Sequence, residues 1–313
     1  MKCGNGERYI MTEVDELLMN GKLKEAMESM RSQPGYEEEM SGYVDLFVNK
    51  NYRKYEVSER LNEILETYQE YFREVFYCGT GEEQAAIRLM QKLCFMLSVS
   101  EADEDVLAEQ LQEVFQKEGY HALFGKTQGY FGPYVWKDTV PTSYQVELPD
   151  GVEEYTVNIL KGFIFRSWMD YLTFGKHGAG GWASSDGTLN CIECAYDFES
   201  EKFTVHFLKH EAQHARDMRE YPDMTSTELE YRAKLVELCY ASDPELLSRF
   251  IRSADENKTH DSHAMASVRI KEGFSGRSYQ NVADIKERAF ELFSEDSEKW
   301  RKQKFDKSIH SCI

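Results

Sequence analysis

The pentapeptide His-Glu-Ala-Gln-His at residues 210–214 constrains this chain more than any other feature of its sequence. Residues 201–219 contain no glycine or proline, and Pro222 follows them, so the sequence predicts a helix here. Residues four apart share one helix face, so His210 and His214 can bind one metal ion. Glu211 lies about 100° further round, beside such an ion rather than on it. The pattern therefore predicts two metal ligands and a carboxylate that suits a general base.

A solvated acidic helix that carries two histidines by chance is the alternative interpretation. The residues before the pentapeptide argue against it, because they are apolar and aromatic: Phe203, Val205, Phe207 and Leu208. The first half of the helix is therefore expected to be buried, and a buried helix favours the metal site. A catalytic zinc normally has three protein ligands and one open position. The next predicted helix, from about Thr225, offers Glu228 and Glu230 as the third ligand.

A strand at 189–198, the H-E-x-x-H helix and a second helix that offers a glutamate resemble the glutamate-type zincins (gluzincins), a group of zinc metallopeptidases. The resemblance covers roughly residues 140–240. It implies a zincin-like fold, Zn²⁺ as cofactor, a peptide or protein substrate, and hydrolysis by zinc-bound water. In this interpretation His210 and His214 bind zinc and Glu211 is the general base. Residues 230–233, Glu-Tyr-Arg-Ala, resemble the segment of the third ligand, which favours Glu230 over Glu228.

The sequence also predicts polar residues that support the metal site or take part in the reaction. Asp217 is expected to accept the second N–H of a ligand histidine, with a surface salt bridge as the alternative. The resemblance implies a histidine or tyrosine that stabilises the oxyanion of the reaction. His263 is the candidate for that role, with His260 and Tyr231 as alternatives. His206 is expected to be a packed, hydrogen-bonded histidine rather than a fourth ligand.

The net charge of −19 excludes several classes of partner. Nucleic-acid binding requires basic patches that neutralise phosphates, and none is visible, so no nucleic-acid partner is expected. Adhesion to an anionic membrane is disfavoured for the same reason, and no stretch has the apolar length of a membrane span. The first residues lead into no apolar segment typical of a signal peptide. Seven cysteines, an odd number spread along the chain, favour free thiols in a reducing cytoplasm.

The chain changes character near residue 122. Residues 1–120 hold 25 acidic and 13 basic side chains, a net charge of −12. They carry apolar stripes at helical spacing, and core packing between antiparallel helices is the expected role of these stripes. After Tyr120, glycines and prolines separate strand-like runs at 130–136, 143–148 and 155–160. The sequence thus predicts an α+β protein, with an acidic all-helical region at 1–122 and a zincin-like region with a small sheet and an active-site helix at 123–313.

Three functional hypotheses follow from these patterns. The leading one is a cytoplasmic zinc metallopeptidase. The second is a catalytically inactive zincin-like protein that acts as a protein-binding module, with a protein partner for its helical N-terminal region. The third treats the pentapeptide as fortuitous and the protein as a helical scaffold. Bound metal separates the first from the third, and chelator-sensitive peptide hydrolysis separates the first from the second.

Overall fold

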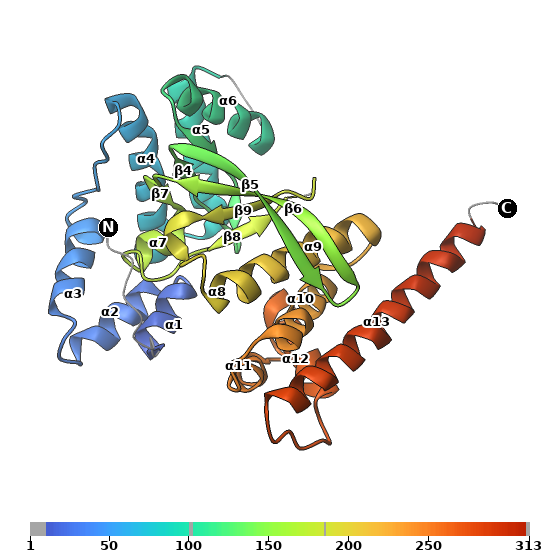
Figure 1. The fold of residues 1–313 in the computed structure, drawn as a ribbon. Helices are drawn as coiled ribbons and strands as arrows, with labels where there is room; N and C mark the ends of the chain where they lie inside the picture. The colour runs from blue at the N-terminus through green and yellow to red at the C-terminus, as the bar shows by residue number, and fades with distance from the viewer. Residues whose placement is uncertain (1–10, 100–102, 185, 311–313) are drawn as a thin grey trace. The chain divides into compact units, whose positions relative to one another are not determined.

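The computed structural model describes residues 11–99, 103–184 and 186–310, and it has the α+β composition that the sequence predicts (Figure 1). The chain divides into two compact units. The first unit comprises Met1–Asp138 and Leu160–Ala179, and the second comprises Thr139–Ile159 and Gly180–Ile313. Each unit has its own hydrophobic core, so each is described by itself.

The first unit begins with helices only, as expected for its N-terminal region. The side chains of Thr12, Ser58 and Asp103 cap three of these helices by accepting a backbone N–H. The first apolar stripe is divided between two helices at Gly21, whose φ of 71° favours glycine. The helices are α1 (Glu13–Met19), α2 (Leu23–Arg31), α3 (Glu37–Tyr43), α4 (Glu59–Phe72), α5 (Glu82–Leu97) and α6 (Glu104–Lys117), and π-helical turns at Val44–Val48 and Arg73–Cys78 extend α3 and α4.

Short strands and one further helix complete the first unit, which therefore extends past residue 122, the expected domain boundary. One sheet has the order β1-β4-β7 and a separate hairpin pairs β2 with β3. The segment 165–172 contains a short strand and then a helix. The elements are β1 (His121–Leu123), β2 (Lys126–Thr127), β3 (Tyr130–Phe131), β4 (Tyr134–Trp136), β7 (Phe165–Arg166) and α7 (Ser167–Leu172).

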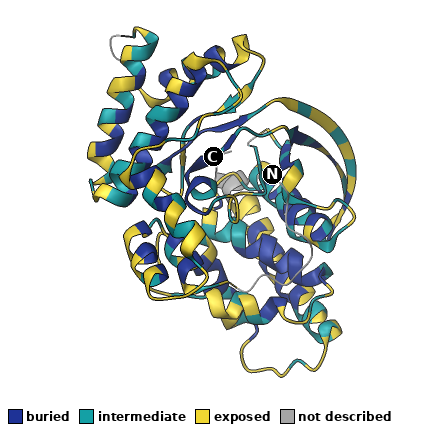
Figure 2. Cartoon of the chain, turned by 90° about the vertical axis from the view of Figure 1, so that its left-hand side faces the viewer, coloured by how far each residue is buried: buried dark blue, intermediate teal, exposed yellow. Residues whose placement is uncertain are grey.

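The core of the first unit is built from the apolar stripes of its helices. Aromatic rings of α4, β7 and α7 meet in it, and the ring of Phe72 lies 6.1 Å from Phe165 and 5.3 Å from Tyr171. Figure 2 shows helices with buried residues on one side and exposed residues on the other. This amphipathic pattern is the one expected from packing of helices around a common core.

The sheet of the second unit has the strand order β5-β6-β9-β8. Its first two strands form a hairpin at the expected turn, where Gly151 has a φ of 128°. The single strand expected at 189–198 is shorter, because a 3₁₀ turn at Glu193–Ala195 follows it. The strands are β5 (Asp138–Leu148), β6 (Gly151–Lys161), β8 (Gly181–Ala183) and β9 (Leu189–Ile192).

The helix expected over 201–219 begins with the one-turn α8, continues through a π-helical segment at Thr204–Lys209, and ends as α9. Helix α10 is the centre of the second unit, because it contacts α9, α12 and α13 and buries every residue from Tyr231 to Cys239. The helices are α8 (Glu201–Phe203), α9 (His210–Glu220), α10 (Ser226–Tyr240), α11 (Leu246–Ser253), α12 (Ser262–Gly273) and α13 (Val282–His310).

The described residues include five of the seven cysteines. Their five cysteines are free thiols, while Cys3 and Cys312 lie outside the described residues. None of their helices combines the length and the apolar character that a membrane span requires.

Candidate metal centre

Helix α9 is held against the sheet through β8 and β9. The aromatic residues that precede it are buried, and the Phe203 and Phe207 rings stack 5.7 Å apart. Strand β8 approaches the helix closely at Gly181. A Cβ atom there would lie 2.1 Å from the Asn190 carbonyl oxygen and 2.4 Å from the Phe207 ring, so only glycine fits. The buried first half that the sequence predicts for this helix is confirmed.

Three side chains from α9 and α10 meet at one point. The Nε2 atoms of His210 and His214 lie 3.0 Å apart. The Glu230 carboxylate oxygens lie 3.7 Å from His210 Nε2 and 3.4 Å from His214 Nε2. Among the described residues, these three form the one group of at least three His, Cys, Asp or Glu side chains that could hold a metal ion. The structure thus brings together the two histidines of the pentapeptide and the favoured third ligand.

The start of α10 explains why Glu230, and not Glu228, reaches the histidines. Thr225 caps this helix, and its hydroxyl accepts the Glu228 N–H at 3.3 Å. The Glu228 carboxylate in turn accepts the Thr225 N–H at 2.9 Å. This reciprocal pair is a capping box, which satisfies backbone donors at the helix start. Glu228 is therefore engaged in capping, and Glu230, two residues further, points to α9.

Glu237 orients the first histidine of the pair. Its carboxylate lies 2.7 Å from His210 Nδ1 and 2.5 Å from His206 Nδ1. An ionised carboxylate can only accept a hydrogen bond, so His210 Nδ1 carries the proton and donates it in the hydrogen bond, and its Nε2 carries the lone pair that faces His214 and Glu230. Such a contact fixes the tautomer and the ring orientation of a metal-binding histidine. His206 is the packed, hydrogen-bonded histidine that the sequence predicts.

The two buried carboxylates of the cluster are held as anions. Burial opposes ionisation of Glu237, but hydrogen bonds from His206 and His210 outweigh it and lower its pKa to about 2. Burial also opposes ionisation of Glu230, and the contacts with His214 and His263 again outweigh it, so the pKa of that carboxyl lies well below its ordinary value. Both groups therefore remain charged at neutral pH, and a carboxylate ligand must be charged to bind a cation.

Lys234 partly balances this negative charge. It is buried on α10, one turn after Glu230 and one turn before Glu237, and its ammonium lies 4.2 Å from the centre of the Phe250 ring. Burial lowers the pKa of Lys234, while the carboxylates of Glu237, Glu230 and Asp261 oppose that effect.

Glu211 lies beside the three candidate ligands, and its half-buried carboxylate makes no hydrogen bond or ion pair among the described residues. Glu211 lies close enough to His214 and Tyr196 to contribute to the electrostatic environment of both. The hydroxyl of Tyr196 is also unpaired within the described residues and lies against Gly180, directly before β8. A free carboxylate and a free hydroxyl thus stand near the cluster.

His263, the candidate for oxyanion stabilisation, lies at the start of α12, where Asp261 caps the helix. Its Nδ1 is 2.9 Å from a Glu230 carboxylate oxygen, and its side chain is 60% exposed. His263 therefore borders the cluster and remains open to solvent. The two alternatives make no such contact: His260 is exposed with no contact to the cluster, and Tyr231 is buried beneath the guanidinium of Arg269.

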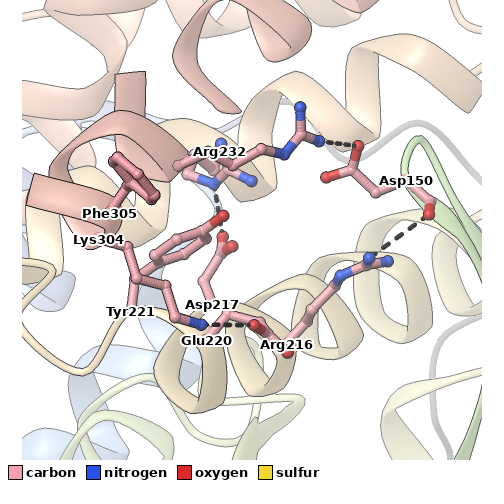
Figure 3. A pocket seen from close by; sticks show the side chains of 9 residues that line it. Asp150, Arg216, Asp217, Glu220, Tyr221, Arg232, Lys304 and Phe305 are labelled. Carbon is pink, nitrogen blue, oxygen red and sulfur yellow. Dashed lines mark hydrogen bonds and ion pairs between the residues drawn. The ribbon is translucent and has the colours of Figure 1, made fainter. Parts of the chain in front are cut away.

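Asp217, expected to accept an N–H from a ligand histidine, makes a different contact. Its carboxylate accepts the Arg232 Nε–H at 2.8 Å, and both side chains are only 1% exposed. Figure 3 shows this pair in a pocket of about 540 Å³ that also contains the Lys304–Glu220 ion pair. Arg232 additionally contacts Asp296 of α13 at 3.1 Å. This pair joins α9 to α10 and α13, so Asp217 supports the helix packing, and Glu237 occupies the role expected of Asp217.

The sequence contained a signal for Glu237 that was missed. Glu230 and Glu237 are seven residues apart, so they lie on the same face of a helix, two turns apart. Histidines 206 and 210 are four apart and likewise share a face. If the two helices face each other, a glutamate pair on one and a histidine pair on the other are expected to make contact. Tyr196 carried no comparable signal, because it lies in an irregular segment between β9 and α8.

The chain was compared with known proteins at three levels. Models of protein families, curated proteins and solved structures all give no match.

Proposed function

We propose that the second unit is a zinc-dependent peptidase of the gluzincin type, with His210, His214 and Glu230 as the metal ligands. The observation that carries this proposal is the convergence of one ligand atom from each residue, all within 4.8 Å of one another. An additional carboxylate, Glu211, stands beside them on the same helix without a partner in the described part of the chain. Two histidines, one glutamate and a free glutamate are the residue set of a catalytic zinc site.

The donor atoms fit a divalent cation. Glu237 leaves the His210 Nε2 lone pair facing the His214 Nε2 atom, only 3.0 Å away. Two imidazole nitrogens at this distance repel one another unless a proton or a cation lies between them. The Glu230 carboxylate is held as an anion, and its Oε2 contacts only the exposed His263 Nδ1, at 2.9 Å, and His210 Nε2, at 3.7 Å, so it is able to bind a cation as well. Imidazole nitrogens with one carboxylate suit zinc among the common metals, and three protein ligands are typical of catalytic rather than structural zinc.

Zinc in this position would polarise the carbonyl of a scissile bond and lower the pKa of a water molecule. The chain's own residues supply the remaining chemistry. Glu211 accepts the proton from the attacking water and returns it to the leaving amine. His263 is exposed and borders Glu230, so its imidazole is the donor proposed for the developing oxyanion. Glu237 holds His210 in the tautomer that directs Nε2 at the ligand cluster.

An extended peptide is the substrate class that the neighbouring strand favours. Strand β8 is at one edge of the sheet β5-β6-β9-β8 and contacts α9. An edge strand presents unpaired N–H and C=O groups, and a bound peptide can add to it as a further strand. A substrate paired with β8 would run beside the helix that carries His210, Glu211 and His214.

The test uses the full chain loaded with zinc and a broad library of unstructured peptides. We expect cleavage that a chelator abolishes and that added zinc restores. Glu211→Gln retains the size of the side chain and removes the base, so cleavage should fall by about 10² or more while zinc content and melting temperature stay near wild type. Loss of zinc in Glu211→Gln would mean that Glu211 is a ligand and that the mechanism is wrong. Full zinc occupancy without any cleavage would favour the inactive binding-module hypothesis.

A further inference from the structure

Helix α5 in the first unit has more apolar surface than its core requires. One face, with Ala85, Leu89 and Leu93, is buried in the core. A second face points to solvent: the side chains of Ile87 and Phe95 are 53% and 86% exposed. A surface helix of a globular protein is normally polar on that side. The outer face of α5 is therefore an apolar surface without a partner in its own unit.

This face lines a groove. The groove has a volume of about 700 Å³ and runs along α5 towards the start of α6, two helices that contact each other (Figure 1). Its floor and walls are mostly apolar, with the polar Gln91 among the apolar residues Ala86, Ile87, Met90, Cys94, Phe95 and Val99. Exposed apolar patches of this kind typically mark interaction sites. Methionine adapts its shape, and it is common at surfaces that receive helices of other proteins.

The rim of the groove is acidic. Glu82, Glu83 and Glu104 line it, and Lys126 is the single cation among its lining residues in the described chain. Lys126 is already neutralised by Glu82 at 3.3 Å. Glu83 and Glu104 make no ion pair or hydrogen bond within the described residues. The surrounding region is acidic too, with a net charge of −12 over residues 1–120. The groove therefore combines an apolar floor with a rim that attracts cations.

We propose that this groove binds a cationic amphipathic helix of a partner protein. Ile87, Met90, Cys94 and Phe95 span about two helical turns, or roughly 12 Å along α5. A partner helix with apolar residues at positions i, i+3 or i+4, and i+7 would insert them between these side chains. Lysine or arginine residues that flank its apolar stripe would pair with Glu83 and Glu104. The proposal is independent of the peptidase proposal, because every residue in it belongs to the first unit.

The test measures binding of a labelled synthetic peptide to the full chain by fluorescence anisotropy. The peptide contains only leucine and lysine, is about 18 residues long, or five helical turns, and carries leucine in one helical stripe. A second peptide has the same composition in scrambled order. We expect saturable one-to-one binding of the amphipathic peptide and much weaker binding of the scrambled peptide, because only the former presents an apolar face.

Two groove variants separate the apolar and the charged contributions. The double variant Ile87→Ser and Phe95→Ser leaves the charge unchanged and should weaken binding by at least about tenfold. The double variant Glu83→Gln and Glu104→Gln should weaken binding and reduce its salt dependence. The matched control, Glu28→Gln with Glu59→Gln, removes two exposed carboxylates outside the groove and should bind like wild type. All variants alter exposed side chains, and circular dichroism should confirm that they fold.

Three outcomes would overturn the proposal. Equal binding of the scrambled peptide would mean that only net charge is recognised. Unchanged affinity in the Ile87→Ser and Phe95→Ser variant would mean that the peptide binds elsewhere. Self-association of the wild-type chain in sedimentation, abolished in the same variant, would mean that a second copy of the chain covers the groove instead.

Discussion

The two units differ in what they bury beside their apolar cores. The buried polar residues of the first unit are almost all neutral: Asn62, Gln69, Ser167 and Thr173, with Asp15 as the one charged group among its described residues. The second unit buries five ionised or ionisable side chains around α9 and α10 and a sixth on α13: His210, Asp217, Arg232, Lys234, Glu237 and Asp296. Buried charge is thus concentrated where the candidate metal centre lies.

This difference matters because a buried charge is unfavourable unless it is paired and hydrogen-bonded. The first unit buries mainly neutral polar groups beside its aromatic core. In the second unit most buried charges have an ionic partner: Arg232 contacts Asp217 and Asp296, and Glu237 contacts His206 and His210. The ammonium of Lys234 lies 4.2 Å from the centre of the Phe250 ring. Buried ionisable groups beside a ligand cluster mark a candidate functional site, whereas the contacts of Arg232 with Asp217 and Asp296 support the packing of the helices.

The largest expected effect compares two substitutions that replace a buried polar residue by methionine, one in each unit. Arg232→Met leaves Asp217 buried without its partner, and removing one partner of a buried pair costs about 3–5 kcal/mol. Gln69→Met in the first unit removes the neutral hydrogen bonds that Gln69 makes with the Arg53 backbone, at 2.8 and 3.0 Å, which should cost about 1–3 kcal/mol. Urea unfolding of the full chain measures both. Equal costs would show that buried charge does not distinguish the two units.

A second prediction concerns zinc and the stability of the second unit. A ligand that binds only the folded state at 100 times its Kd stabilises that state by about 2.7 kcal/mol. Saturating zinc should therefore raise the unfolding midpoint of the wild-type second unit, and His214→Ala should abolish the increase. His121→Ala is the matched control, because His121 is an exposed histidine of the first unit and its loss should leave the increase intact. An increase that survives in His214→Ala would place the zinc elsewhere.

Much of the fold follows from local sequence signals. The caps at Thr12, Ser58 and Asp103, the break at Gly21 and the hairpin turn before Gly151 are set by residues close in sequence. The division into units was not predictable in this way. Residues 160–179 belong with the first unit although residues 139–159 belong with the second. That exchange depends on tertiary packing of β7 and α7, which local patterns do not encode.

In the candidate site, too, local sequence patterns predicted some residues and not the contacts that depend on tertiary packing. His210 and His214 were readable because helical spacing places them on one face. Glu230 was chosen over Glu228 because residues 230–233 resemble the third-ligand segment of the gluzincins. Asp217 was misjudged because its distance along α9 says nothing of Arg232, which reaches it from α10. Position on a helix therefore predicts which residues can face a metal, while their partners depend on the facing helix.

The smallest predicted effect tests whether Glu237 belongs to the metal centre. Glu237→Gln replaces a carboxylate that accepts from two histidines by an amide that can accept from only one of them. The tautomer and orientation of His210 should loosen, and loss of such a partner typically weakens metal binding by about 10–100-fold. Zinc affinity, measured by competition with a chelator of known affinity, reports this directly.

Glu228→Gln is the matched control for that measurement, because Glu228 lies on the same helix and makes only the capping contacts with Thr225. Its zinc affinity should equal that of wild type. His206→Ala sharpens the test further: it removes one partner of Glu237 but leaves the 2.7 Å contact with His210, so zinc affinity should fall less than in Glu237→Gln. If Glu237→Gln and Glu228→Gln bound zinc equally, Glu237 would serve only to neutralise buried histidines. The concentration of buried charge in the second unit would then reflect helix packing and not the metal.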